Sequence, residues 1–225
     1  MKYIVHQERE LQPPRKLSGY IRDPKTSLLI AREPSFQDMS WYAQKDAALK
    51  KGTPMASVAI FLPYRNKVIE AAQGGIGLRD GEGRRISLND AKQLASLLTE
   101  NCCVNFDTQF FENSKGKMQV TYLCLSLQGD LEQVTEPLQW KKNIHNGNLV
   151  DLQWNHQGMP MQKSGLQEFD PQNNMYVYEP FDGSVPWFGA DAYGAYLGCD
   201  GGPRDSDGGL GTLVCAAGAE KILRQ

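Results

Sequence analysis

The sequence predicts an α+β domain with two main helices and short, mostly antiparallel strands. Apolar residues recur at helical intervals in a few segments, most clearly in 87–101. Short runs rich in β-branched and aromatic residues, such as 118–127, alternate with turn residues. With 225 residues, of which 40% are hydrophobic, the chain can bury a substantial core. We expect one domain over 1–225, with the proline-rich residues 1–52 packed on it as an N-terminal extension.

The first two helical patterns lie before residue 74. Residues 41–51 are dense in Ala, Leu and Lys and are followed by Gly52, a residue typical of helix ends. Pro63 is expected to begin a second helix over 64–73. The apolar run 53–62 before it fits a buried strand as well as a buried helical turn, since its spacing does not separate the two.

The clearest helix begins at Ser87. Ser87 and Asp90 form an S-x-x-D pattern close to a capping box, and one apolar stripe continues to Asn101. The glycine-rich segment 74–83 before it has neither the G-x-G-x-x-G spacing nor the lysine of a phosphate-binding loop. It is therefore interpreted as a turn.

Strand patterns and turn residues fill most of the remaining sequence. The polar stretch 132–144 has no clear pattern, and Asn146-Gly147 is a strong signal for a tight turn. The last strand closes the domain and is expected to be mostly buried and central in its sheet. Strands are expected at 1–5, 27–30, 104–111, 118–127, 149–154, 175–178 and 211–216.

Charge and hydropathy exclude several classes of partner. The net charge of −2 creates no general attraction to nucleic acid or to an anionic membrane. No apolar run approaches the roughly 18 residues of a membrane span. The N-terminal segment becomes charged too early for a signal peptide, so synthesis in the cytoplasm is expected, with incorporation into a virion left open.

Cysteine and histidine residues show no catalytic or metal-binding spacing. The five cysteines include no C-x-x-C pair, and reduced, buried thiols are expected. His6, His145 and His156 are scattered and lie near no zinc-binding or nucleophile motif, so we interpret them as ordinary hydrogen-bonded histidines. We expect no metal and no cofactor.

Residues 190–209 have an unusual composition. They include six Gly and four Asp but no Lys, Glu, Gln, Met or Trp. Trp187 and Gly189 precede them, and the apolar run 210–214 follows. A solvated surface loop would explain the Gly and Asp content. The length of the segment favours a binding loop, and its Tyr and Asp residues resemble the chemistry of antibody loops. Packing of Tyr193 and Tyr196 in the core is the alternative.

This arrangement resembles the C-terminal part of the C-type lectin fold. More closely, it resembles the formylglycine-generating-enzyme branch, which includes the variable proteins of diversity-generating retroelements. In those proteins the retroelement rewrites adenines in AAC and AAT codons, which then cannot encode Lys, Glu, Gln, Met or Trp. These are the five residue types missing from 190–209. The resemblance is close over 185–217 and extends elsewhere only to size and element order.

The resemblance implies a ligand-recognition protein with a variable surface, at about 187–214, on a fixed scaffold. The ligand would be an unknown protein or glycan, and the chain would not be an enzyme. The residues expected to be exposed and to bind it are Ala190, Asp191, Ala192, Tyr193, Ala195, Tyr196, Cys199, Asp200, Arg204, Asp205, Ser206 and Asp207. The residues expected to support them are Trp187, Gly189, Leu210, Gly211 and Val214, with Trp187, Leu210, Leu213 and Val214 packed beneath the loop.

Two alternatives remain, and the first is a domain related to an oxidase or one that binds a metal. An oxidase of the formylglycine-generating type would need a close C-terminal cysteine pair, whereas Cys199 and Cys215 are sixteen positions apart. A metal-binding domain would fit residues 205–209, which resemble half of a calcium loop, but the later Glu is missing and free surface aspartates are expected. The second alternative is a structural virion or cell-surface protein without a ligand.

Overall fold

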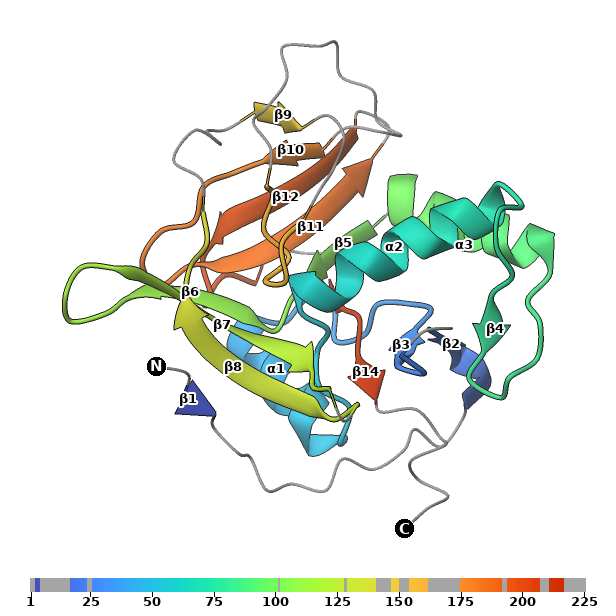
Figure 1. The fold of residues 1–225 in the computed structure, drawn as a ribbon, viewed down its shortest axis with the longest axis horizontal. Helices are drawn as coiled ribbons and strands as arrows, with labels where there is room; N and C mark the ends of the chain where they lie inside the picture. The colour runs from blue at the N-terminus through green and yellow to red at the C-terminus, as the bar shows by residue number, and fades with distance from the viewer. Residues whose placement is uncertain are drawn as a thin grey trace.

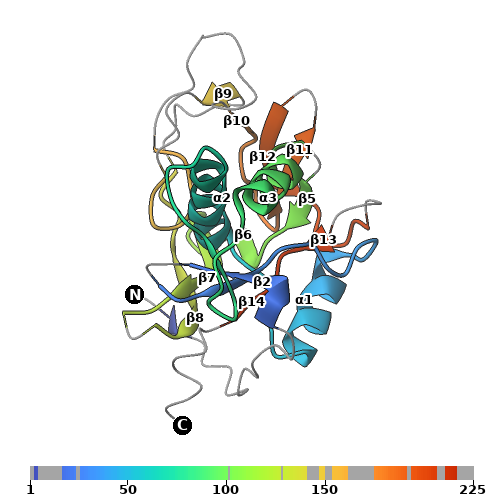
Figure 2. The ribbon, with the colours of Figure 1, turned by 90° about the vertical axis from the view of Figure 1, so that its right-hand side faces the viewer.

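The structure is a computed structural model. It describes residues 3–4, 17–23, 26–100, 102–127, 129–140, 147–149, 154–161, 175–191, 194–206 and 211–216. Within these ranges the fold is α+β, with three α-helices, one short 3-10 helix (η1, Leu17–Gly19) and three sheets. Figure 1 shows the six-stranded sheet beside α2 and α3, and Figure 2 shows the same layers from the side.

The α-helices are α1 (Trp41–Lys50), α2 (Val58–Ala72) and α3 (Leu88–Glu100). The Ser87 hydroxyl accepts a hydrogen bond of 3.0 Å from the backbone N–H of Asp90, as the capping pattern predicts. The helices expected at 41–51 and 87–101 are therefore confirmed. In the described part of the chain, no helix has the length and apolar character needed to cross a membrane.

Helix α2 begins earlier than expected. The Ser57 hydroxyl accepts a bond of 3.3 Å from the backbone N–H of Ile60, and this cap starts the helix at Val58. Pro63, which was expected at the helix start, lies inside the helix instead. The apolar residues before it face the core, so burial outweighs the unfavourable proline position. The second half of the run 53–62 is thus helical, and the first half contributes only an isolated bridge at Met55.

The first two sheets each have four strands. The meander sheet has the order β1-β8-β7-β6, and all its pairs are antiparallel. Its strands are β1 (Tyr3–Ile4), β8 (Leu131–Pro137), β7 (Met118–Leu125) and β6 (Thr108–Glu112). The N-terminal sheet has the order β14-β3-β2-β4. Its strands are β14 (Cys215–Ala216), β3 (Leu29–Ala31), β2 (Tyr20–Arg22) and β4 (Arg79–Asp80).

The third sheet has six strands in the order β13-β5-β11-β12-β10-β9. Its antiparallel centre is the pair β11 and β12, while β10 with β12 and β13 with β5 are parallel. Its strands are β13 (Gly211–Thr212), β5 (Cys102–Asn105), β11 (Val185–Asp191), β12 (Gly194–Gly201), β10 (Met175–Val177) and β9 (Gly147–Leu149).

Several strand predictions are confirmed and others need correction. The strands expected at 1–5, 27–30, 118–127 and 175–178 correspond to β1, β3, β7 and β10. The stretch 132–144 contains most of β8, which the polar sequence did not reveal. Strand β2 was not predicted, and most of the strand expected at 149–154 lies outside the described residues.

Two expected strands are each divided between two sheets. The segment 104–111 breaks at Phe106 and Asp107, because β5 joins the six-stranded sheet and β6 joins the meander sheet. The closing segment 211–216 likewise divides into β13 and β14. Both pieces lie at sheet edges, so the expected central position is wrong, although all six residues are buried. They are buried because the segment passes between Ser35 and Met55, each of which bridges to it.

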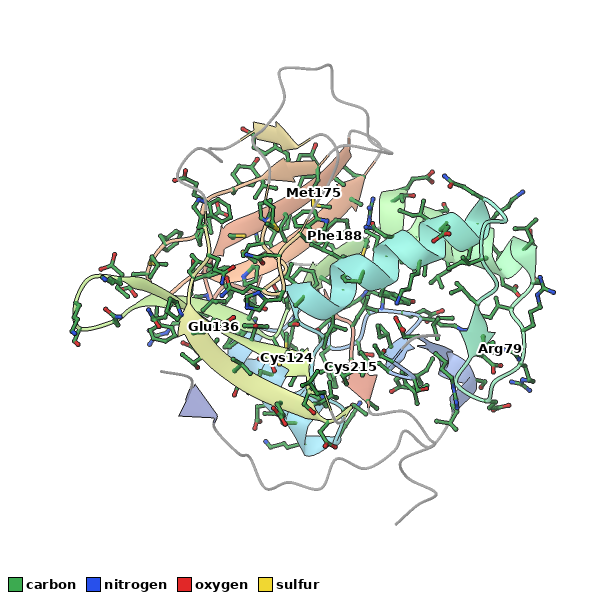
Figure 3. The ribbon with its side chains drawn as sticks, in the orientation of Figure 1. Arg79, Cys124, Glu136, Met175, Phe188 and Cys215 are labelled. Atoms are coloured by element: carbon green, nitrogen blue, oxygen red, sulfur yellow. The ribbon has the colours of Figure 1, made fainter. Side chains whose placement is uncertain are left out.

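The core joins the helices to the six-stranded sheet. The Phe61 ring of α2 lies 4.9 Å from the Phe188 ring of β11 and 5.0 Å from the Phe106 ring, measured between centroids. The guanidinium of Arg65 is buried and lies 5.4 Å above the Phe188 ring. The Trp41 indole donates a 2.6 Å hydrogen bond to the carbonyl of Phe106. The contacts of Phe61 and Arg65 with Phe188 attach β11 to α2, and Figure 3 labels Phe188 between these two elements.

Candidate recognition surface

The segment predicted as a binding loop is largely a β-hairpin. Strands β11 and β12 pair antiparallel, with Ala190 opposite Ala195 and Asp191 opposite Gly194. The side-chain carboxylate of Asp191 accepts a 3.1 Å hydrogen bond from the backbone N–H of Gly194. The loop prediction is therefore wrong for 190–191 and 194–201. Pairing with β5 and β10 on either side satisfies the backbone of the hairpin despite its loop-like composition.

The inner face of the hairpin is core. Side chains alternate along a strand, and this alternation turns every second residue of β11 and β12 toward α2 and α3. Ala190, Ala195 and Cys199 are buried, with exposed fractions of 6%, 0% and 0%. Their expected exposure is a misprediction that follows from reading the hairpin as a loop. Phe188 and Leu197 complete this inner face.

The outer face of the same sheet carries aromatic residues. Tyr196 on β12 is the register partner of Tyr176 on β10, and both are half-buried. The ring of Tyr176 lies 4.9 Å from the ring of Tyr178, between centroids. Burial, then the nearby Asp191 carboxylate and Tyr178, raise the pKa of Tyr196. Tyr176 and Tyr178 were not predicted as site residues, although their alternation in the strand 175–178 was an available signal.

Trp187 on β11 also lies on this outer face, opposite Gly198 of β12. Its six-membered ring covers Gly189, where an added Cβ would lie 2.8 Å from Cζ3. Its Nε1 atom lies so near Gly198 that a Cβ there would be 2.1 Å away. The indole was expected beneath the loop, but alternation turns Phe188 inward and Trp187 outward. Glycines beneath the ring allow it to lie close to the sheet.

The remaining exposed candidates lie near the end of β12 (Asp200) and in the C-terminal turn that follows it (Arg204, Asp205 and Ser206). Asp200, Arg204, Asp205 and Ser206 are exposed. The backbone N–H of Asp205 donates a 3.1 Å hydrogen bond to the carbonyl of residue 202, which orders the turn. This group lies about 20 Å from Asp191 along β12, because a strand rises by roughly 3.3 Å per residue. The candidate residues therefore form an elongated surface rather than one cluster.

We call this surface the recognition face. It spans the outer side of β10, β11 and β12 and the C-terminal turn. Its members are Tyr176, Tyr178, Trp187, Asp191, Tyr196, Asp200, Arg204, Asp205 and Ser206. The candidates Ala192, Tyr193, Asp207 and the scaffold residue Leu210 lie outside the described residues.

Two of the predicted scaffold residues, Gly211 and Val214, lie in the closing segment, whose strand β13 is separated from β11 by β5. Gly211 is buried, and a Cβ there would lie 2.9 Å from Pro34 Cβ and 3.0 Å from the Ser35 carbonyl oxygen. Val214 bridges to Met55. Leu213 and Val214 are buried in the core, as predicted.

The two C-terminal cysteines do not form a pair. Cys199 lies in the six-stranded sheet and Cys215 in the N-terminal sheet, and both thiols are free and fully buried. Burial raises the pKa of each thiol well above its usual value, which keeps the protonated form. Among the described residues, no three His, Cys, Asp or Glu side chains gather in the manner of a metal site.

Comparison with known proteins found no similar protein family, no similar curated protein and no similar solved structure.

Proposed function

We propose that this chain is a ligand-recognition protein that binds its target with the recognition face. The main support is the division of the hairpin into two faces with different tasks. Ala190, Ala195 and Cys199 pack inward, while Asp191, Tyr196 and Asp200 point outward from the same two strands. A binding surface on a rigid sheet loses little conformational entropy when a ligand binds.

The residue types of the recognition face suit binding more than catalysis. Tyr and Trp provide large, rigid contact areas with one polar group each, and Asp, Ser and Arg provide hydrogen bonds around them. Trp187 on β11 and Tyr176 on β10 lie on either side of β12, and large aromatic residues of this kind often contribute most to affinity at interfaces. The ligand is a protein or a glycan, and the chain is not an enzyme.

We also propose that the face is diversified by a retroelement, on a scaffold of the C-type lectin type within its formylglycine-generating-enzyme branch. The absence of Lys, Glu, Gln, Met and Trp from 190–209 supports this. The structure limits diversification to positions where any side chain fits. Exposed substitutions usually change stability by less than about 0.5 kcal/mol, whereas core substitutions commonly cost about 2–5 kcal/mol. The described candidates that point outward are Asp191, Tyr196, Asp200, Arg204, Asp205 and Ser206, all exposed except the half-buried Tyr196.

The test compares two sets of substitutions within the permitted residue types. Replacement of all six outward-facing positions should leave the melting temperature nearly unchanged. Replacement of the buried Ala190, Ala195 and Cys199 by Tyr or Asp should lower it by many degrees. Unfolding of the sixfold variant would show that these positions are structural and would refute the proposal.

A second experiment tests binding directly. A library of the chain with the six positions randomised within the permitted set would be displayed on yeast and selected against egg-white lysozyme as a model target. Folded binders of micromolar or better affinity are expected. A folded library that yields none would contradict recognition by this face. The diversification itself is tested in the neighbouring DNA, which should contain a reverse-transcriptase gene and a near-copy of the codons for 187–217.

A further inference from the structure

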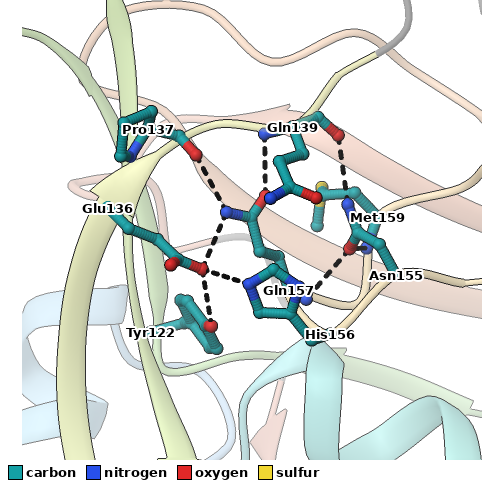
Figure 4. A network of polar contacts seen from close by, with 8 residues as sticks. All are labelled: Tyr122, Glu136, Pro137, Gln139, Asn155, His156, Gln157 and Met159. Carbon is teal, nitrogen blue, oxygen red and sulfur yellow. Dashed lines mark hydrogen bonds and ion pairs between the residues drawn. The ribbon is translucent and has the colours of Figure 1, made fainter.

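A polar network on the meander sheet supports a second site, distant in sequence from the recognition face. The Oε1 atom of Glu136 accepts three hydrogen bonds: 2.9 Å from the Tyr122 hydroxyl, 2.5 Å from His156 Nε2 and 2.9 Å from Gln157 Nε2 (Figure 4). Glu136 itself is buried. Tyr122 and His156 are therefore held in fixed orientations.

The turn that carries His156 is held equally firmly. The side-chain carbonyl of Asn155 accepts bonds of 2.9 Å from the backbone N–H groups of both Gln157 and Met159. Gly158 has a φ of +77°, and a Cβ there would lie 2.5 Å from the backbone nitrogen of Ala59. Only glycine lets this turn approach the first turn of α2 so closely.

A cavity of about 350 Å³ lies between this network, α2 and the β2–β3 hairpin. Its volume falls at the small end of ligand pockets, which span roughly 300–1,000 Å³. Tyr122 and His156 line it beside apolar residues of all three elements, among them Ile30, Ile60 and Val134. The polar residues on the other side are Asp23, Thr26 and Lys67.

The charges that border the cavity are compensated. Lys67 forms an ion pair with Asp23, and any positive charge on His156 is matched by Glu136. An anion would meet the Asp23 carboxylate, and a cation would find that carboxylate already engaged, since it accepts bonds from both Lys67 and the backbone N–H of Thr26. Burial of a further charge there is unfavourable.

Hydrogen-bond donors remain in excess. The described contacts use one of the three N–H groups of Lys67. The Thr26 hydroxyl accepts from the backbone N–H of Leu28 at 3.3 Å, which leaves its own O–H to donate. A ligand that accepts hydrogen bonds from these remaining donors must supply an acceptor oxygen. The rest of the ligand must be apolar, because it would pack against the apolar lining of the cavity.

We propose that the cavity binds a small, uncharged molecule that has an apolar body and a carbonyl-type oxygen, with the oxygen toward Thr26 and Lys67 and the body against Ile60 and Val134. This site is independent of the recognition face. It needs no residue of 187–214.

The experiment uses three probes of the same size: acetophenone, benzoate and benzylammonium. Binding to the full chain is measured by chemical shift changes in ¹H–¹⁵N spectra. Acetophenone should bind with a millimolar or lower Kd, at least fivefold tighter than either charged probe, and should shift the amides of Leu28, Ala59 and Leu125. No binding of acetophenone, or tighter binding of benzoate or benzylammonium, would overturn the proposal.

Two pairs of variants locate the binding. Ala59→Phe fills the cavity and should abolish binding, whereas Ala47→Phe on α1 makes the same change elsewhere and should not. Thr26→Val removes the hydroxyl and should weaken binding about fivefold, the size of one hydrogen bond, whereas Thr26→Ser should retain it. Unchanged affinity in Thr26→Val would exclude the assigned orientation even if Ala59→Phe failed to fold.

Discussion

Trp187 and Gly198 are register partners on β11 and β12, and the indole of the first lies directly over the second. This contact predicts that Gly198→Ala destabilises the protein, because a Cβ would lie 2.1 Å from Nε1 and the indole must move. We expect a loss of about 2 kcal/mol, typical of overpacking, in urea denaturation. Gly19→Ala is the control, since no atom lies within 4 Å of the added Cβ there.

A double-mutant cycle separates this contact from a general effect of alanine in a strand. In a Trp187→Ala background, which should itself lower the melting temperature by many degrees, Gly198→Ala should cost little further stability. An equal cost in both backgrounds would mean that the close approach of the indole is not the cause.

The inward and outward faces of β12 should differ in their tolerance of large residues. Ala195 is fully buried and Asp200 is exposed. Ala195→Tyr must displace the core, so we expect a loss of about 3 kcal/mol or complete unfolding. Asp200→Tyr should change stability by less than about 0.5 kcal/mol. Thermal and urea unfolding of the two variants would measure both losses of stability. Similar losses at the two positions would contradict the assignment of inward and outward faces.

The cysteines should differ in reactivity. Cys199 and Cys215 are buried and burial raises the pKa of each, whereas Cys103 is partly exposed. In the folded protein at pH 8, iodoacetamide should modify Cys103 well before the two buried thiols, as followed by mass spectrometry. In 6 M guanidinium chloride all of them should react at similar rates. Rapid native modification of Cys199 would contradict its position on the inner face.

The stability should depend on pH through Glu136. Burial alone would raise the pKa of Glu136, but hydrogen bonds from Gln157, Tyr122 and His156 outweigh it and lower the pKa below its usual 4.5. A lowered folded-state pKa stabilises the fold above pH 4.5, and this contribution is lost as the pH falls through the folded-state value.

Glu136→Gln should therefore lower the free energy of unfolding at pH 7 by about 2 kcal/mol, the scale of hydrogen bonds to a charged group. The difference from the unmodified protein should shrink as the pH falls below 4.5, as measured by urea denaturation at each pH. The exposed Glu112→Gln serves as the control for the same chemical change. A constant difference across the pH range would show that the Glu136 charge contributes nothing.

Local signals predicted the helices and the apolar strands. Ser87 and Asp90 form the predicted cap, and the β-branched run 118–127 forms β7. The hairpin of β11 and β12 could not be recognised, because its Gly and Asp content is typical of loops. Its strands form because β5 and β10 lie on both sides, and this information is distant in the sequence. The buried and the exposed residues of this hairpin could therefore not be separated from the sequence alone.

The cavity site depends on even more distant residues. Glu136 and His156 were unremarkable in the sequence, since neither belongs to a motif. They meet because the glycine turn at Gly158 packs against the start of α2 and brings His156 within 2.5 Å of Glu136 on β8. No spacing rule connects a polar strand to a turn twenty positions later.

The closing segment 211–216 also affects how the protein can be made. It supplies an edge strand to the six-stranded sheet and another to the sheet built from residues 20–31. Cys215 pairs with Ile30, so the early strand β3 can gain this partner only after one of the last described residues has been synthesised. During synthesis, Leu29 and Ile30 remain without this partner until the ribosome has released residue 216. Nascent chains that stall earlier expose this apolar edge and would be substrates for chaperones.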